Sequence, residues 1–207
     1  MNQQTESALV RRSPDEAQVV PIYTDDPSAN WMDVKRFEHI QRVAKIFAES
    51  QLVPQQYRGK MADCIIGVQM AMRLQVDPFM FLQNTYVVHG RPGMEAKLAI
   101  ALVNTRGPFE GPIDWRFEGE PKTDAWTCTA YAQHKVTGRP VEEELSWETV
   151  KAEGWLAKDG SKWRTMPVRM FKYRTAMNLA RSYCPEVLMG MYSADELEDM
   201  GPRIITV

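Results

Sequence analysis

The sequence predicts an α+β fold in which several helices pack on a small three-stranded antiparallel β-meander. Two observations predict this class. Apolar residues recur every three or four positions in the first and last parts of the chain, which is typical of amphipathic helices. In the middle of the chain they alternate with polar residues, which is typical of strands that bury one face. The expected order is two helices, a short strand, a helix, three strands and further helices.

Two helices are expected at the beginning of the folded region. The first covers residues 32–49, and the second covers about residues 57–75 after a break at Pro54. The second ends before Pro78, because the residue that precedes a proline is disfavoured in the α region. Residues 62–72 are apolar on nearly all sides, so we expect this helix to be the central helix of the core.

A strand, a turn and a helix follow. Residues 86–88, Tyr-Val-Val, predict a small strand, and residues 89–93 carry two glycines and a proline that predict a turn. Helical spacing resumes from Glu95 to Thr105 and ends at Gly107. Glu95 then lies in the first helical turn, where a carboxylate interacts favourably with the helix dipole.

Three alternating runs make up the predicted meander, at residues 113–118, 126–133 and 141–146. A glycine-containing turn joins the second run to the third, as in an antiparallel hairpin. The chain becomes helical again after Trp147, with a glycine-rich break at residues 154–160. A long helix near residues 166–183 and a short acidic one near residues 193–200 complete the fold.

Length and composition predict one folded domain. The 207 residues are 44% hydrophobic and 25% charged, which suffices for a sizeable core. We expect a flexible polar arm at residues 1–30, a single domain at residues 31–200 and a short tail at residues 201–207. No apolar run reaches about 18 residues, so we expect no membrane span and no membrane partner. Three cysteines without C-x-x-C spacing, and no signal peptide, favour a cytoplasmic location.

The charges are unevenly distributed along the chain. The net charge is only −2, but between residues 158 and 183 seven basic residues accompany a single acid, Asp159. Aromatic residues interleaved with these cations include Trp155, Trp163, Phe171 and Tyr173. Cations that neutralise phosphates, together with aromatic rings that stack on bases, are typical of single-strand nucleic-acid binding. The alternative is a solvated charged helix face.

Enzymatic motifs are scarce. No phosphate-binding G-x-x-x-x-G-K-[ST] loop occurs, and the three histidines lack partners at zinc-ligand spacing. Asp77 with Glu95-x-Lys97 fits the loose pattern of metal-dependent nucleases, in which two carboxylates hold Mg²⁺ and a lysine steadies the attacking water. That chemistry needs Glu95 and Lys97 on one strand, whereas their surroundings favour a helix. The nuclease remains an alternative function.

Two blocks of the chain carry longer motifs. The first runs from Ile66 to Pro78 and continues through Leu82-Gln83-Asn84, Gly90-Arg91-Pro92 and Lys97-Leu98-Ala99 to Gly107. The second runs from Trp163 to Met170 and continues through Tyr173-Arg174, Ala180-Arg181, residues 185–192 and Asp195-Glu196. In this order, over roughly residues 35–200, the two blocks resemble the RecT family of phage recombination proteins.

The resemblance implies a RecT/Redβ-like annealing fold and a non-catalytic function. Such a protein binds single-stranded DNA without ATP, forms rings or helical filaments, and pairs complementary strands through an annealed duplex intermediate, beside a phage exonuclease. The location implied is the cytoplasm of a bacterial host, if the gene belongs to a phage or prophage. We expect no cofactor and leave assistance by Mg²⁺ open. Family members often carry a further C-terminal segment for partner binding, and this chain stops soon after Asp199.

An annealing protein must hold phosphates and leave bases free, so we expect backbone contacts to dominate. The candidate DNA contacts are Lys97, Lys135, Arg139, Lys162, Arg164, Arg169, Lys172 and Arg174, with Arg91, Arg181 and the neutral donor Asn84 ranked lower. Lys135 and Arg139 lie at the expected hairpin tip, where a finger could close over DNA. Arg181 could instead pair with Glu186 or Glu196 inside the fold.

Assembly and a competing function are also open at this stage. The acidic segment 195–199 and the basic stretch 158–181 could bind head to tail between copies, or pair within one chain. A generic single-strand-binding protein would also be basic and aromatic, but it would protect strands rather than anneal them.

Overall fold

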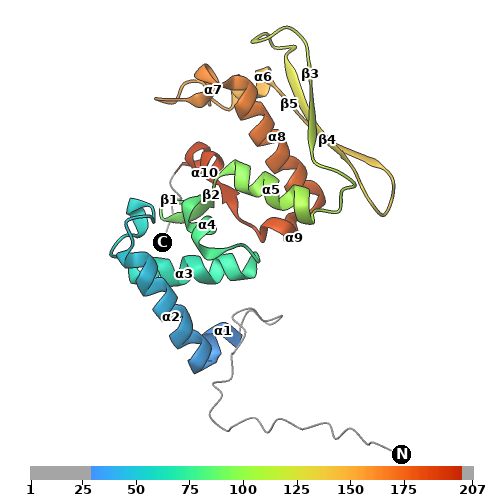
Figure 1. Cartoon of the computed structure of the whole chain (residues 1–207). Helices are drawn as coiled ribbons and strands as arrows, with labels where there is room; N and C mark the ends of the chain where they lie inside the picture. Colours follow the sequence, from blue (N-terminus) through green and yellow to red (C-terminus); the bar gives the residue numbers. More distant parts are fainter. Residues whose placement is uncertain (1–28, 202–207) are drawn as a thin grey trace, which may run out of the picture.

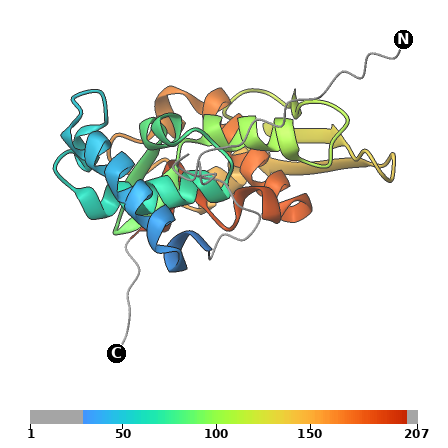
Figure 2. The same cartoon turned by 60° about the horizontal axis from the view of Figure 1, so that its bottom comes forward.

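The computed structural model describes residues 29–201 and has an α+β fold with two three-stranded sheets (Figure 1). The N-terminal helices lie at one end of an elongated body and the hairpin of β4 and β5 at the other (Figure 2). The expected arm at residues 1–30 and tail at residues 201–207 lie almost entirely outside the described residues. No helix within residues 29–201 is long and apolar enough to cross a membrane.

The predicted antiparallel meander is confirmed. It consists of β3 (Asp114–Glu118), β4 (Thr127–Gln133) and β5 (Pro140–Ser146), in that order. Cys128 and Ala130 of β4 and Leu145 of β5 are buried, whereas alternate residues of β3 are exposed. The period-two pattern of the sequence therefore identifies the inner face of this sheet correctly.

The central helix is α8 (Pro167–Tyr183), which lies between the meander and α5 (Ala96–Arg106). Its buried residues are Met170, Phe171, Thr175, Ala176, Met177, Leu179 and Ala180. The expectation that residues 62–72 form the central helix is wrong. They belong to α3 (Met61–Arg73), which packs on α2 (Val34–Glu49) and α4 (Pro78–Gln83) and leaves Ile66 half exposed.

A second sheet was not expected. It is mixed, because β1 (Thr85–Val88) pairs antiparallel with β2 (Arg91–Met94), and β6 (Tyr192–Ser193) pairs parallel with β2. The claim of a single antiparallel meander is therefore only partly right. The expected turn at residues 89–93 is also wrong, because only His89 and Gly90 form the turn, both with positive φ, as a two-residue type I′ hairpin turn requires. Strands this short carry no recognisable alternation.

The remaining elements follow the expected order. The predicted helices at residues 32–49, 95–105, 166–183 and 193–200 correspond to α2, α5, α8 and α10 (Ala194–Met200). The bounds of the other elements are Ala29–Met32 for α1, Gln55–Tyr57 for a 3-10 turn, Trp147–Ala152 for α6, Lys162–Thr165 for α7 and Pro185–Leu188 for α9.

A close contact fixes α10 against the second sheet. A Cβ on Gly93 of β2 would lie 2.8 Å from a methyl carbon of Leu197 and 3.2 Å from the backbone of Ala194. The helix begins with a capping box, in which the Ser193 side chain accepts from the backbone of Glu196 and the Glu196 carboxylate accepts from the backbone of Ser193. The acidic helix is thus held on β2 at a defined position.

Candidate nucleic-acid interface

A groove of about 640 Å³ lies between the second sheet and the helices α7 and α8. One wall is formed by β1 and the start of α5, and the other by α7 and the first two turns of α8. Residues Ala194, Asp195 and Glu198 of α10 lie between these walls, and we call them the floor. A shallow surface formed by residues 165–169, Lys172 and Tyr173 continues from the α8 wall.

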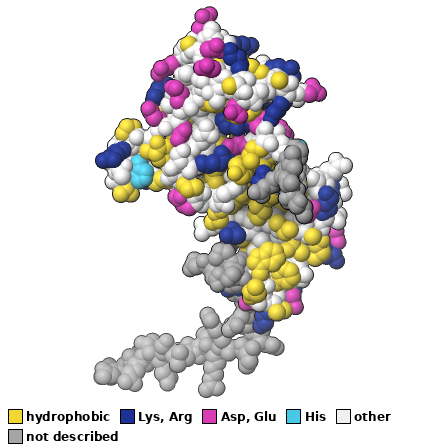
Figure 3. All heavy atoms as spheres, turned by 180° about the vertical axis from the view of Figure 1, so that it is seen from behind, with side chains coloured by type: hydrophobic (Ala, Val, Ile, Leu, Met, Phe, Trp, Pro, Cys, Tyr) yellow, Lys and Arg dark blue, Asp and Glu magenta, His cyan; other side chains and the backbone are white. Residues whose placement is uncertain are grey.

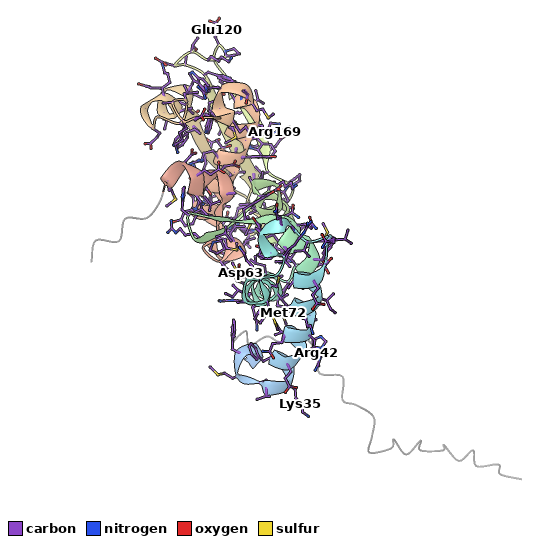
Figure 4. All side chains as sticks on the ribbon, turned by 90° about the vertical axis from the view of Figure 1, so that its left-hand side faces the viewer. Lys35, Arg42, Asp63, Met72, Glu120 and Arg169 are labelled. Carbon is purple, nitrogen blue, oxygen red and sulfur yellow. The ribbon has the colours of Figure 1, made fainter. Side chains whose placement is uncertain are left out.

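Three of the predicted DNA contacts line this groove. Lys162 and Arg169 lie on the α7–α8 wall, and Lys97 lies on the wall opposite. Arg169 is exposed, and Figure 4 shows it at the surface of the upper half of the body. Lys172, three residues further along α8, lies on the shallow surface, with its amino group 5.0 Å from the ring centre of Trp115. A helix whose other face is buried by Met170 and Phe171 thus presents these cations together.

The aromatic residues that were expected to stack on bases are mostly in the core. Trp163 and Phe171 are almost completely buried, and Trp155 stacks on Trp163 with ring centres 5.2 Å apart. Their rings cover the inner face of the meander, so the predicted base stacking by these three residues is wrong. The accessible aromatic groups in the groove are Tyr173 and Tyr86. Tyr86 was not expected to contact DNA, because it lies outside the basic stretch of the sequence.

Several cations of the basic stretch are engaged by α10. Arg174 pairs with Asp199, and its guanidinium lies 4.2 Å from the ring centre of Trp155. Lys158 contacts the same carboxylate at 3.0 Å. Only 11% of the Arg174 side chain is exposed, so this predicted DNA contact is already neutralised and covered.

Arg181 is engaged in the same way. It makes a two-pronged pair with the buried carboxylate of Glu196, one arm at 2.6 Å, and lies 4.6 Å from the ring centre of Tyr192. The intrachain alternative stated for Arg181 is therefore correct. The same holds for the acidic segment, because Glu196 and Asp199 pair with α8 of their own chain and are not free to bind the basic stretch of a second copy.

Two of the carboxylates that line the groove differ in the direction in which their pKa is shifted. Glu95 accepts from the Tyr86 hydroxyl at 2.7 Å and contacts Lys97 at 2.5 Å. Its burial by itself raises the pKa, but these two partners outweigh burial and hold the pKa of Glu95 below its usual value. Burial raises the pKa of Asp195, and the nearby charge of Glu198 raises it further. Figure 3 shows acidic and basic side chains interspersed over the upper half of the molecule.

The other predicted contacts lie elsewhere. The Asn84 amide donates to the Met80 carbonyl at the end of α4, and Arg91 lies 5.7 Å from the ring centre of Tyr192. Arg164 is exposed on α7 and donates to the Lys158 carbonyl at 2.9 Å. Lys135 and Arg139 are exposed at the tip of the β4–β5 hairpin, far from α7 (Figure 1). The groove therefore brings together a subset of the candidates.

The residues of the nuclease alternative do not form a metal centre. Asp77 caps α4 and accepts from the backbone of Met80 at 2.9 Å. Lys97 lies in a helix, so Glu95 and Lys97 do not share the strand that this chemistry needs. Within the described part of the chain no three His, Cys, Asp or Glu side chains are grouped to hold a metal ion.

Exposed cations beside accessible tyrosines on an open groove are features of proteins that bind single-stranded nucleic acids. A model of the RecT family matches residues 110–205, and this segment of the chain is similar to that family. The predicted resemblance is thereby confirmed for the second block of motifs. RecT family proteins are single-strand annealing proteins of phage-type recombination. No curated protein and no solved structure matches the chain.

Proposed function

We propose that the protein binds single-stranded DNA by its phosphate backbone and anneals complementary strands without ATP. The observation that carries the proposal is the convergence of Lys162 and Arg169 on one wall of an open groove, within the segment that matches the RecT family. Neither side chain has an ion-pair partner among residues 29–201, so both are available for phosphates. Lys172 extends the same cationic line along α8.

The walls suit a strand whose bases stay free. Cations on an exposed helix contact phosphates without enclosing the bases, which a second strand must reach in order to pair. Tyr86 and Tyr173 offer rings on which any base can stack, since stacking depends little on sequence. We therefore propose slight sequence preference and no catalytic residue.

The proposal extends to assembly and partners. A single 23.8 kDa chain covers few nucleotides, whereas annealing needs long strands held in register. Copies in a ring or filament would bind one strand at high effective concentration. In phage-type recombination an exonuclease would supply the single strands. Binding and annealing would need no cofactor. Separate reactions that lack ATP or lack Mg²⁺ test this expectation.

The first prediction concerns the cationic wall. Replacing Lys162 and Arg169 together by glutamate should lower single-strand affinity at least about tenfold, because two phosphate contacts become repulsive. The slope of log K against log salt should become shallower by about 0.7 for each lost contact. Titration of a labelled oligonucleotide by fluorescence anisotropy at several salt concentrations measures both quantities.

Lys45 on α2 and Lys122 in the β3–β4 loop provide the matched control, since their reversal changes the net charge equally at exposed positions outside the groove. If this control loses affinity as strongly as the groove variant, general charge and not the groove binds DNA. Annealing of complementary oligonucleotides separates the proposed function from simple strand protection. Mg²⁺-dependent cleavage of the oligonucleotide would instead support the nuclease.

A further inference from the structure

The floor of the groove carries negative charge where a DNA-binding site usually carries none. Asp195 and Glu198 are three residues apart on α10 and so share one face of this helix. Both line the groove, and both also line the adjoining hollow that extends toward His89 and Lys158. A strand that enters from either side therefore meets these two carboxylates.

The two floor carboxylates make no direct side-chain contact with a cation in the described part of the chain. Within residues 29–201 neither one has an ion pair or a side-chain hydrogen bond, in contrast with Glu196 and Asp199 of the same helix. Arg174, whose charge acts on Asp195, is already paired with Asp199. The raised pKa of Asp195 agrees with a carboxylate that loses water on burial and lies near the like charge of Glu198, which the charge of Arg174 offsets only in part.

The walls differ in available charge as well. On the β1–α5 wall Lys97 is paired with Glu95 at 2.5 Å, so that wall is close to neutral. On the α7–α8 wall Lys162 and Arg169 have no acidic partner within the described residues. The field across the groove is therefore polarised, with positive charge on α7–α8 and negative charge on α10.

We propose that Asp195 and Glu198 repel the phosphates of a bound strand, confine its backbone to the α7–α8 wall, and hold its affinity below what the cations alone would give. This inference rests on the proposed single-strand binding. A strand held along one wall leaves its base-pairing edges accessible, and moderate affinity lets it shift between registers while a complementary strand is tested.

Removing the two negative charges of the floor tests the inference, because this change should raise the affinity for DNA. Asp195→Asn combined with Glu198→Gln should bind labelled oligothymidine about tenfold more tightly than the unchanged protein at the same salt concentration. One carboxylate about 5 Å from a phosphate in water-like surroundings alters the binding constant by about 3- to 4-fold. The gain should shrink as salt rises, because added ions screen these charges.

Glu148→Gln combined with Glu153→Gln is the matched control. It changes the net charge by the same two units on exposed residues at α6, outside the groove. Glu198→Gln alone, at an exposed position, keeps the test available if the double variant folds poorly by circular dichroism. This single variant should gain about 3-fold.

The outcomes separate this inference from the proposed function. Tighter binding by the floor variants but not by the α6 control supports the inference. Unchanged or weaker binding by folded floor variants overturns it, and so does an equal gain in the control. If the unchanged protein itself does not bind oligothymidine at low salt, the proposed function fails first.

Discussion

At the scale of single residues, neighbouring cations of α8 differ because of partners far along the chain. Arg169 is exposed in the groove, whereas Arg174 is covered and paired with Asp199, which lies 25 residues away in sequence. Helical spacing predicts which side chains share a face but not which carboxylate another helix brings to it. The sequence could therefore nominate both arginines and could not rank them.

The Arg181–Glu196 pair predicts a pH dependence of stability. Burial raises the pKa of Glu196, but the hydrogen bonds and charge of Arg181, with the Ser193 backbone, outweigh it and place the pKa below the ordinary 4.5. A carboxyl whose pKa is lower in the folded state stabilises the fold above its unfolded pKa. We expect this contribution to be complete near pH 7 and to disappear as pH falls below about 4.5 through the folded pKa.

Glu196→Gln should therefore lower the free energy of unfolding by about 1–3 kcal/mol near pH 7, because a charge-assisted hydrogen bond is lost. Denaturant titrations at several pH values should show the two proteins converge as the solution becomes acidic. A difference that stays constant down to pH 3 would show that shape, and not ionisation, matters at this position.

At the scale of elements, periodicity predicted the meander and the long helices because each buries one regular face. It missed β2, β6 and α4, which are at most six residues long and therefore complete less than two helical turns or no more than two strand alternations. Their positions depend on tertiary contacts, such as the pairing of β6 with Gly93 and Met94. Short elements of this kind carry too few residues for a pattern.

Substitution of Gly93 tests how closely α10 packs on the second sheet. Gly93→Val should lower the free energy of unfolding by about 1–3 kcal/mol, because its side chain would overlap Leu197 and the backbone of Ala194. Since α10 forms the groove floor, single-strand affinity should change as well. Gly111→Val is the control, at a glycine where nothing lies within 4 Å of an added Cβ. Equal stability of the two variants in thermal unfolding would contradict the tight contact.

At the scale of the whole molecule, the groove joins parts of the chain that are far apart in sequence. Lys97 and Arg169 face one space although about seventy residues separate them, and α10 completes it from the C-terminal side. The sequence nominated Lys97, Lys162, Arg169 and Lys172 as DNA contacts from charge and family resemblance, and these residues line the groove or its shallow extension. It could not predict the floor, because the acidic helix was expected to serve contacts between copies.

The pairing of charges within one chain predicts how copies of the whole molecule assemble. The acidic and basic segments satisfy each other within one chain, through Arg174 with Asp199 and Arg181 with Glu196, so contacts between copies should not depend on these charges. We therefore expect a homo-oligomer at micromolar concentration that persists at salt concentrations that release DNA, since counterion release weakens phosphate contacts first. Light scattering with and without complementary oligonucleotides, in low and high salt, measures this directly. A strictly monomeric protein with DNA bound would contradict the expected assembly and would favour a strand-protecting function over annealing.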